Sequence, residues 1–309
     1  MKRIIAILTL AFAACAFFAG AAWAEKSGGL KKRIAVVDFE DKTGHGAWHI
    51  GSGMADMLTT ALVKSGNFMV IERQQLEQVM KEQQLGLTGA VTPQSAAQIG
   101  KLLGVELIVL GSVNEFGEKQ SSVGGSVGSK ISKGMFGLNK VGVDSKTARV
   151  GLDIRLVNTT TGEIVAADGI AEEESKKGLD VGTDDFAFSN DSRFDETLAG
   201  KATRKAVNKV VDMITTAMDK LPWSGKILKV NANKTVMIKP GAEGGVKVGD
   251  VFNVFSQGEE IIDPDTGLSL GSEEKQIGTI EVTEAKDKFA TAKVVSGSGF
   301  KMGDMVREK

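Results

Sequence analysis

The apolar run VELIVLGSV (Val105–Val113) and the glycine- and serine-rich stretch SSVGGSVGSKISKGMFG (Ser121–Gly137) that follows it decide how this chain folds. The continuously apolar centre of the first run suits a strand covered on both faces of a sheet. In the second stretch Val123, Val127 and Ile131 take odd positions, whereas the even positions hold small or polar residues. Such alternation over about 9–11 residues is typical of a strand with one face in lipid and the other in water.

The alternation changes near Gly134. Phe136 and Leu138 have the opposite parity from Met135, as at a turn or bulge, and the apolar residues after them begin the return of a hairpin. One hairpin cannot close a barrel in a bilayer, so several subunits would have to contribute strands. The same composition also fits a glycine-serine loop or a soluble hairpin, and the residues alone leave these interpretations open.

The N-terminus has the pattern of an export signal. Lys2 and Arg3 precede an apolar core, and AWA (Ala22–Ala24) supplies small residues at a cleavage site. The only cysteine, Cys15, lies in this segment, where FAAC loosely resembles a lipoprotein cleavage box. We therefore expect a signal peptide over residues 1–24 and a periplasmic, outer-membrane-associated protein. Cleavage after AWA and lipidation at the cysteine both remain open.

Residues 31–113 alternate between strand and helix patterns. Buried strands are predicted at Ile34–Phe39, at Phe68–Glu72 and in the apolar run above, with helices between them. The first helix has its apolar residues at positions i, i+3, i+4, i+7 and i+8, which are Met54, Met57, Leu58, Ala61 and Leu62. The order strand, helix, strand, helix, helix, strand predicts an α/β domain.

The second half begins with a hairpin whose turn is at Gly162 and continues with a helix from Glu196 to about Met218. The residues that this helix is predicted to bury are Leu198, Val207, Val210, Val211, Ile214 and Met218. KLPWSG (Lys220–Gly225) then ends this helix with Pro222 and indicates a domain boundary. Strand-like runs and glycine turns follow, with matching turns at Gly249–Asp250 and Gly303–Asp304. The predicted fold is an α/β periplasmic domain with long β-hairpins (25–222), followed by a small all-β barrel-like domain (223–309).

The sequence offers little catalytic chemistry. A net charge of −1 without a basic block argues against a nucleic-acid partner. GLSLG matches a nucleophile pattern, but both histidines precede Ser269 and no helix follows it. His45 and His49 have the spacing of a metal pair on a helix, yet Gly44 and Gly46 favour a loop. We predict no enzyme, no metal and no cofactor.

Four segments resemble the curli production assembly/transport component (CsgG) family: IAVVDFEDKTG, GSGMADMLTTALVKSGNFMVIERQQLEQVMKEQ, LLGVELIVLGSV and LDIRLVNTTTGEIV. They lie within about Ile34–Met218. The resemblance implies an α/β domain that forms a ring. Each subunit of such a ring sends two hairpins into a shared outer-membrane barrel, which is an ungated secretion channel for unfolded polypeptide.

By this analogy the two membrane hairpins fall at about 118–146 and 171–194. The loop of about Gly44–Ile50 would narrow the channel, with His45, Trp48 and His49 as candidate pore residues, since aromatic and polar rings set pore width and wetting. The candidate membrane residues are Val123, Val127, Ile131, Met135, Phe136 and Leu138.

Two features depart from that pattern. The second hairpin contains EEESKKG, with charges on both parities that would cost about 2–4 kcal/mol each at the lipid midplane. The final β-module resembles the C-terminal module of the flagellar protein FlgT and indicates a docking role. The alternative function is thus a soluble, non-enzymatic periplasmic scaffold of envelope or flagellar assembly. The expected partners are other copies of the chain, the outer membrane, and a secreted polypeptide or envelope-assembly proteins.

Overall fold

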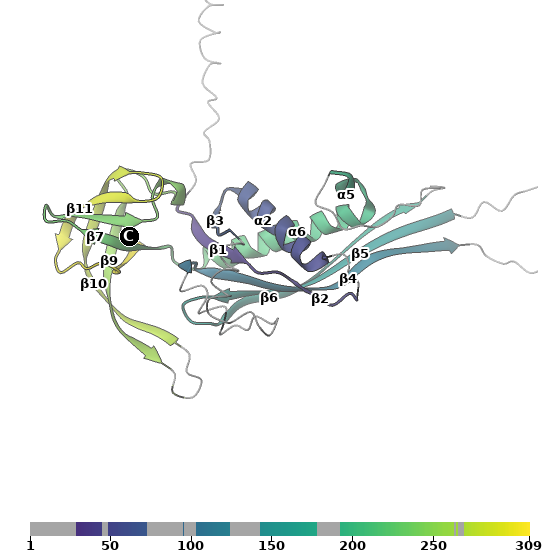
Figure 1. The fold of residues 1–309 in the computed structure, drawn as a ribbon, viewed down its shortest axis with the longest axis horizontal. Helices are drawn as coiled ribbons and strands as arrows, with labels where there is room; N and C mark the ends of the chain where they lie inside the picture. The colour runs from purple at the N-terminus through teal and green to yellow at the C-terminus, as the bar shows by residue number, and fades with distance from the viewer. Residues whose placement is uncertain are drawn as a thin grey trace, which may run out of the picture.

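The chain forms a mixed α/β sheet domain with long strands, followed by a six-stranded β-barrel (Figure 1). The computed structural model describes residues 29–44, 49–72, 95, 103–123, 143–177, 192–262, 264 and 269–309. The fold class predicted from the sequence is confirmed. In these ranges no helix combines the length and apolar character needed to cross a membrane.

The sheet of the first domain has the order β3-β1-β4-β5-β6. β1 lies between β3 and β4 and runs parallel to both. β5 runs antiparallel to β4, and β6 runs antiparallel to β5. The short β2 runs parallel to the middle of β4. The strands are β1 (Lys32–Val36), β2 (Glu40–Asp41), β3 (Phe68–Val70), β4 (Leu107–Val123), β5 (Val143–Asn158) and β6 (Ile164–Lys177).

Two helices, α2 (Ile50–Ser65) and α6 (Leu198–Asp219), lie on the same face of this sheet (Figure 1). Their predicted inward residues are confirmed, since Met54, Leu58 and Leu62 of α2 are buried with Val207, Val210 and Ile214 of α6. The start predicted for α6, at Glu196, is two residues early, because a separate short helix, α5 (Ser192–Glu196), precedes α6. The helices predicted between 73 and 102 lie, apart from Ser95, outside the described residues.

The C-terminal barrel closes in the order β10-β11-β8-β7-β12-β9. Trp223 from the inter-domain linker is 4% exposed and stacks on Phe252, with 5.0 Å between the ring centroids. The barrel therefore has a core of its own. Its elements are β7 (Ser224–Val230), β8 (Thr235–Lys239), η2 (Ala242–Gly244), β9 (Val251–Ile262), β10 (Ser269–Ala285), β11 (Ala290–Gly297) and β12 (Met305–Glu308).

The two matching turns of the barrel have the same backbone geometry. In Gly249–Asp250 and in Gly303–Asp304 the glycine is left-handed, with φ of 93° and 96°. In each turn the aspartate accepts a hydrogen bond at 2.7 Å from the backbone N–H three residues earlier, that of Lys247 or Lys301. The repeat in the sequence thus marks two copies of one turn, and glycine is required because other residues rarely adopt this φ.

Replacing Phe252 by alanine should destabilise the barrel, because this ring is 1% exposed and its removal leaves a cavity beside Trp223. We expect a loss of about 3–5 kcal/mol in the barrel's unfolding transition, measured by urea denaturation followed by circular dichroism and tryptophan fluorescence. Val248→Ala is the control, since Val248 is 65% exposed and should change stability by less than about 0.5 kcal/mol. An unchanged midpoint for Phe252→Ala would contradict this packing.

Candidate functional site

The candidate site is an arm of three strands that extends the sheet on the side away from the barrel (Figure 1). We define the arm as Glu115–Val123 of β4, Val143–Gly151 of β5 and Ala171–Lys177 of β6. Its first two strands pair continuously from Glu115 opposite Gly151 to Val123 opposite Val143. A bulge at Asn114 separates this ladder from the part of β4 inside the domain, and bulges bend and re-aim strands.

Both edges of the arm are open within the described part of the chain. β4 pairs with β2 only at Ser112 and Val113, and beyond that point, among the described residues, it pairs with β5 alone. β6 pairs with β5 along one edge, and its other edge is the end of the sheet. Rows of backbone N–H and C=O groups at such edges favour pairing with another strand.

One face of the arm is covered by protein and the other is polar. Phe116, Ala148 and Val150 belong to the core that α6 covers. On the opposite face Arg149 lies between two carboxylates, 3.5 Å from Glu115 and 3.3 Å from Glu173. These side chains are about half exposed, so each pair contributes at most about 1 kcal/mol. This part of the arm therefore presents charged groups to solvent.

The acidic residues at the start of the predicted second hairpin face helix α6. Glu172 forms an ion pair with Lys209, and Glu174 forms one with Lys205, one turn earlier on the helix. The glutamate side chains are only 12% and 21% exposed. The hydrogen bond and the charge of Glu174 raise the pKa of Lys205. These residues thus belong to the α/β domain, and their charge is compensated there.

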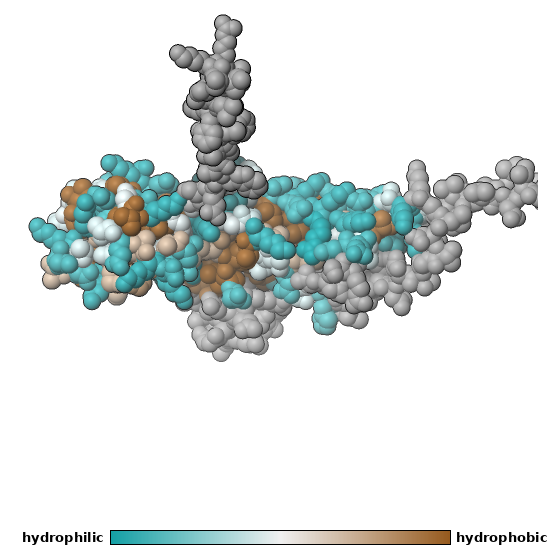
Figure 2. All heavy atoms as spheres, turned by 90° about the horizontal axis from the view of Figure 1, so that it is seen from above, coloured by the Kyte–Doolittle hydropathy of each residue, from teal (hydrophilic) through white to brown (hydrophobic). Residues whose placement is uncertain are grey.

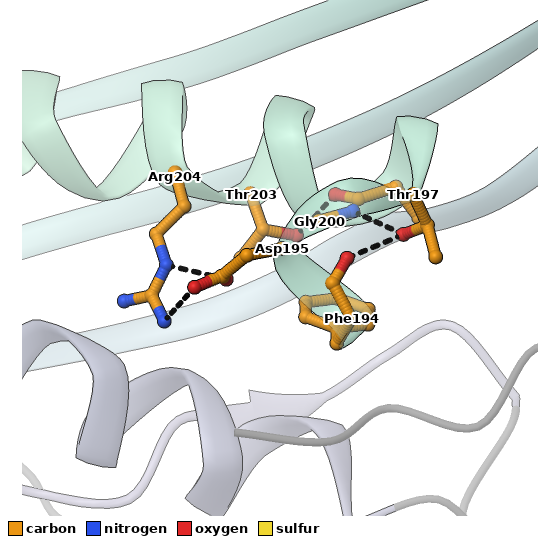
Figure 3. Close-up of polar contacts among 7 residues, drawn as sticks. Phe194, Asp195, Thr197, Gly200, Thr203 and Arg204 are labelled. Carbon is orange, nitrogen blue, oxygen red and sulfur yellow. Dashed lines mark hydrogen bonds and ion pairs between the residues drawn. The ribbon is translucent and has the colours of Figure 1, made fainter. Parts of the chain in front are cut away.

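Helix α6 begins in a capped turn close to the arm (Figure 3). The Thr197 hydroxyl accepts a hydrogen bond from the Gly200 N–H at 2.9 Å and donates one to the Phe194 carbonyl at 2.7 Å. A Cβ at Gly200 would lie 1.8 Å from that carbonyl oxygen, so only glycine fits. The N-cap at Thr197 was not predicted, although a threonine ahead of an amphipathic helix is a common N-cap signal.

The same turn fixes the chain where it returns from the second predicted hairpin. Phe194 is 5% exposed and stacks on Phe116 of β4, with ring centroids 6.4 Å apart. Arg204 of α6 donates two hydrogen bonds to Asp195, at 2.7 and 3.0 Å (Figure 3). The described chain therefore ends at Lys177 of β6 and resumes at Ser192, in a helix whose Phe194 lies against Phe116 at the start of the arm.

The predicted pore loop also begins at the root of the arm, which is the end of the arm next to Val113 and the Asn114 bulge. β2 ends there, and the Lys42 N–H donates to the Val113 carbonyl at 2.9 Å. At the other end of the loop His49 is the exposed N-cap residue of α2, in a left-handed conformation with φ of 49°. Its carbonyl accepts from the Gly53 N–H at 3.0 Å. His45 and Trp48 lie outside the described residues.

The predicted membrane residues follow directly from the end of the arm. Val123 is the last residue of β4 and pairs with Val143. Five of the candidates lie outside the described residues and stay predictions: Val127, Ile131, Met135, Phe136 and Leu138. In the ranges that are described, no three histidine, cysteine, aspartate or glutamate side chains group into a metal site. The arm is thus suited to pairing strands.

Comparison with solved structures finds remote likenesses. The hypothetical protein CT253 from Chlamydia trachomatis is 15% identical, over 60% of this chain and 95% of that one, with a TM-score of 0.37. The lipoprotein GNA1162 from Neisseria meningitidis is 17% identical over 60% and 99%, with a TM-score of 0.34. The PelC dodecamer from Paraburkholderia phytofirmans is 12% identical over 59% and 88%, with a TM-score of 0.30.

Sequence comparison is more informative. An uncharacterized protein of Aquifex aeolicus (strain VF5) is 33% identical over 86 residues, which cover 28% of this chain and 17% of that protein. The chain therefore spans about a sixth of the length of this curated relative. The family model described as curli production assembly/transport component CsgG matches residues 21–240. Since this match spans more than half of the 309 residues, the chain belongs to the CsgG family.

Proposed function

We propose that the chain is a subunit of a ring-forming outer-membrane channel of the curli-transport type, which exports unfolded polypeptide. The observation that carries this proposal is the three-stranded arm with an open edge on each side. Identical subunits joined head to tail through two different edges form a closed ring when their rotation closes. Such a ring removes every open edge at once.

The strand count supports a fourth strand in each subunit. β4 and β6 both run antiparallel to β5, so they are parallel to each other. Direct pairing of β6 with β4 of the next copy would interrupt an antiparallel barrel, whereas an even number of strands per subunit keeps the pattern unbroken. We propose that the segment between Lys177, the last residue of β6, and Ser192, the first residue of α5, supplies this strand. Residues 124–142 form the first membrane hairpin.

The contacts of the glutamates remove one objection to a membrane role. Charges at Glu172 and Glu174 would be costly in lipid, but both side chains face lysines of α6. The membrane-embedded parts are accordingly limited to residues beyond the arm. The loop after β2 starts beside the arm, where the Lys42 N–H bonds to the Val113 carbonyl, so a ring would place the starts of these loops around its mouth, and we propose that the loops narrow the path of the cargo.

The first test removes the hairpin tip. Because Val123 and Val143 pair directly, Asn-Gly in place of residues 124–142 can close the β4–β5 hairpin with a two-residue turn. We expect the full-length chain to be extracted from outer membranes as a ring, seen by negative-stain electron microscopy. The variant should fold, leave the membrane fraction and form no ring.

The matched control shortens the other long hairpin. Ile262 and Ser269 also pair directly, so Asn-Gly in place of residues 263–268 makes the same kind of change in the barrel domain. This control should still give membrane-bound rings. Rings from the 124–142 variant, or only monomeric periplasmic protein from the unaltered chain, would contradict the channel.

A second test determines whether the Glu172 side chain lies against Lys209 or in the membrane. Glu172→Gln should lower stability by about 0.5–1 kcal/mol because the ion pair with Lys209 is lost. A double-mutant cycle with Lys209→Gln should show that coupling, whereas the exposed pair Glu40 and Lys42 should show almost none. Membrane extraction should stay unchanged. An increase of membrane-bound protein with Glu172→Gln would place this side chain in lipid.

A soluble periplasmic scaffold is the second candidate, and the polar face of the arm favours it. Arg149, Glu115 and Glu173 form a charged ladder that suits water or a protein partner. The appended barrel offers a separate docking module, and its likeness to the FlgT module remains a prediction. In this case the 124–142 variant keeps both its solubility and its partner binding, which separates the two functions.

A further inference from the structure

The two domains meet along a seam that the chain crosses near Gly29–Lys31 and again at Asp219–Ser224. The Lys31 N–H donates to the Gly244 carbonyl of the barrel at 2.8 Å. Leu30 packs against the barrel core. A Cβ on Gly244 would lie 3.1 Å from the sulfur of Met69 in β3. The barrel therefore rests on the starts of the strands of the α/β domain.

A carboxyl group bridges this seam. Glu106 stands just before β4, and one of its oxygens accepts a hydrogen bond from the Arg33 N–H of β1 at 2.6 Å. The other oxygen lies 3.5 Å from the hydroxyl of Ser224, the first residue of β7 in the barrel. The Glu106 N–H in turn donates to the Arg33 carbonyl at 3.0 Å. One side chain thus contacts both domains.

Two cations of β1 act on this carboxyl group, and charged groups of the barrel interact in turn with those cations. Arg33 and Lys32 of β1 are the cations that act on it. Lys32 donates to the Met218 carbonyl and is attracted by Asp219 at the end of α6 and by Glu308 of β12. On the barrel side, Lys239 of β8 interacts with Arg33 and with Lys226 of β7.

Burial dominates the electrostatics of the seam. It raises the pKa of Glu106 from 4.5 to about 7, against the opposing effects of the Arg33 N–H, its own N–H and the two cations. Burial also lowers the pKa of Lys32 and that of Lys239. The seam therefore disfavours charge on Glu106, although the carboxyl group would be ionised at neutral pH if it were exposed to water.

We propose that protonation of Glu106 controls how tightly the barrel docks on the α/β domain, with the neutral acid closing the seam and the carboxylate opening it to water. The inference does not depend on the channel function. The chemistry requires only two states of one joint, one with the carboxyl group buried and one with it hydrated. The hinge is the linker between α6 and β7, which contains Pro222.

The direction of the pH effect follows from linkage. An acid whose pKa is raised in the docked state stabilises docking fully below its ordinary pKa of 4.5, and this contribution is lost as the pH rises through about 7. The docking equilibrium should weaken by roughly tenfold between pH 6 and pH 8, and by at most about 300-fold over the whole range.

Spin-label distance measurements on the full chain test this joint. Cys15→Ser removes the only thiol, and Lys201→Cys on α6 with Lys229→Cys on β7 places one label on an exposed residue of each domain. Diluting labelled chains with unlabelled Cys15→Ser protein restricts the signal to distances within one chain. We expect two distance populations, whose open-to-closed ratio rises about tenfold from pH 6 to pH 8.

Two variants identify the titrating group. Glu106→Gln keeps the shape and stays neutral, so the closed population should dominate at every pH. Glu284→Gln removes an exposed carboxylate of β10 and should respond like the parent. A parent distribution that is constant between pH 5 and pH 8 overturns the proposal without reference to any variant. A full pH response in Glu106→Gln overturns it as well, because another group, such as Lys32, would then be responsible.

Discussion

The pairing of β4 with β5 is the interaction on which the rest of the molecule depends. It runs from Leu107 opposite Asn158 to Val123 opposite Val143, and so joins the buried sheet to the arm in one ladder. Burial of Phe116, Ala148 and Val150 on one face of the arm fixes the register there. A slip by one residue would turn these side chains to the other face and every charged residue of the arm with them. The core therefore also determines which groups the arm presents.

The periodicity of the sequence was sufficient to predict the fold class, the inward faces of α2 and α6, and the two glycine turns of the barrel. Contacts between segments distant in the chain were not predictable in this way. Alternation along β6 shows that Glu172 and Glu174 share a face, but nothing local shows that Lys205 and Lys209 cover it. The stacking of Phe194 on Phe116 likewise joins residues almost eighty positions apart. The membrane and pore candidates remain predictions, apart from the placement of Val123 and His49.

Both domains pair charges between strands, as at Arg149 in the sheet and at Lys293 and Glu281 in the barrel, and each adds a further means of ordering its polar groups. In the α/β domain, charges are paired between a strand and a helix, as at Glu172, or across neighbouring strands, as at Arg149. In the barrel, repeated turns bind their own aspartates to backbone N–H groups, and Trp223 carries the linker into the core. At the seam, Glu106 is a largely buried carboxyl group that contacts both domains. The joint is therefore the place where a change of charge state acts on both halves.

The long pairing of β4 with β5, which is interrupted at the Asn114 bulge, has a mechanical consequence. A pull on the tip of the arm, directed along the strands, loads β4 and β5 in the same direction and reaches the domain as shear on the bonds between β4 and β1. A sideways pull would instead open the bonds one after another. The arm is thus stiffer along its own axis than across it, because its strands continue into the hydrophobic core of the domain.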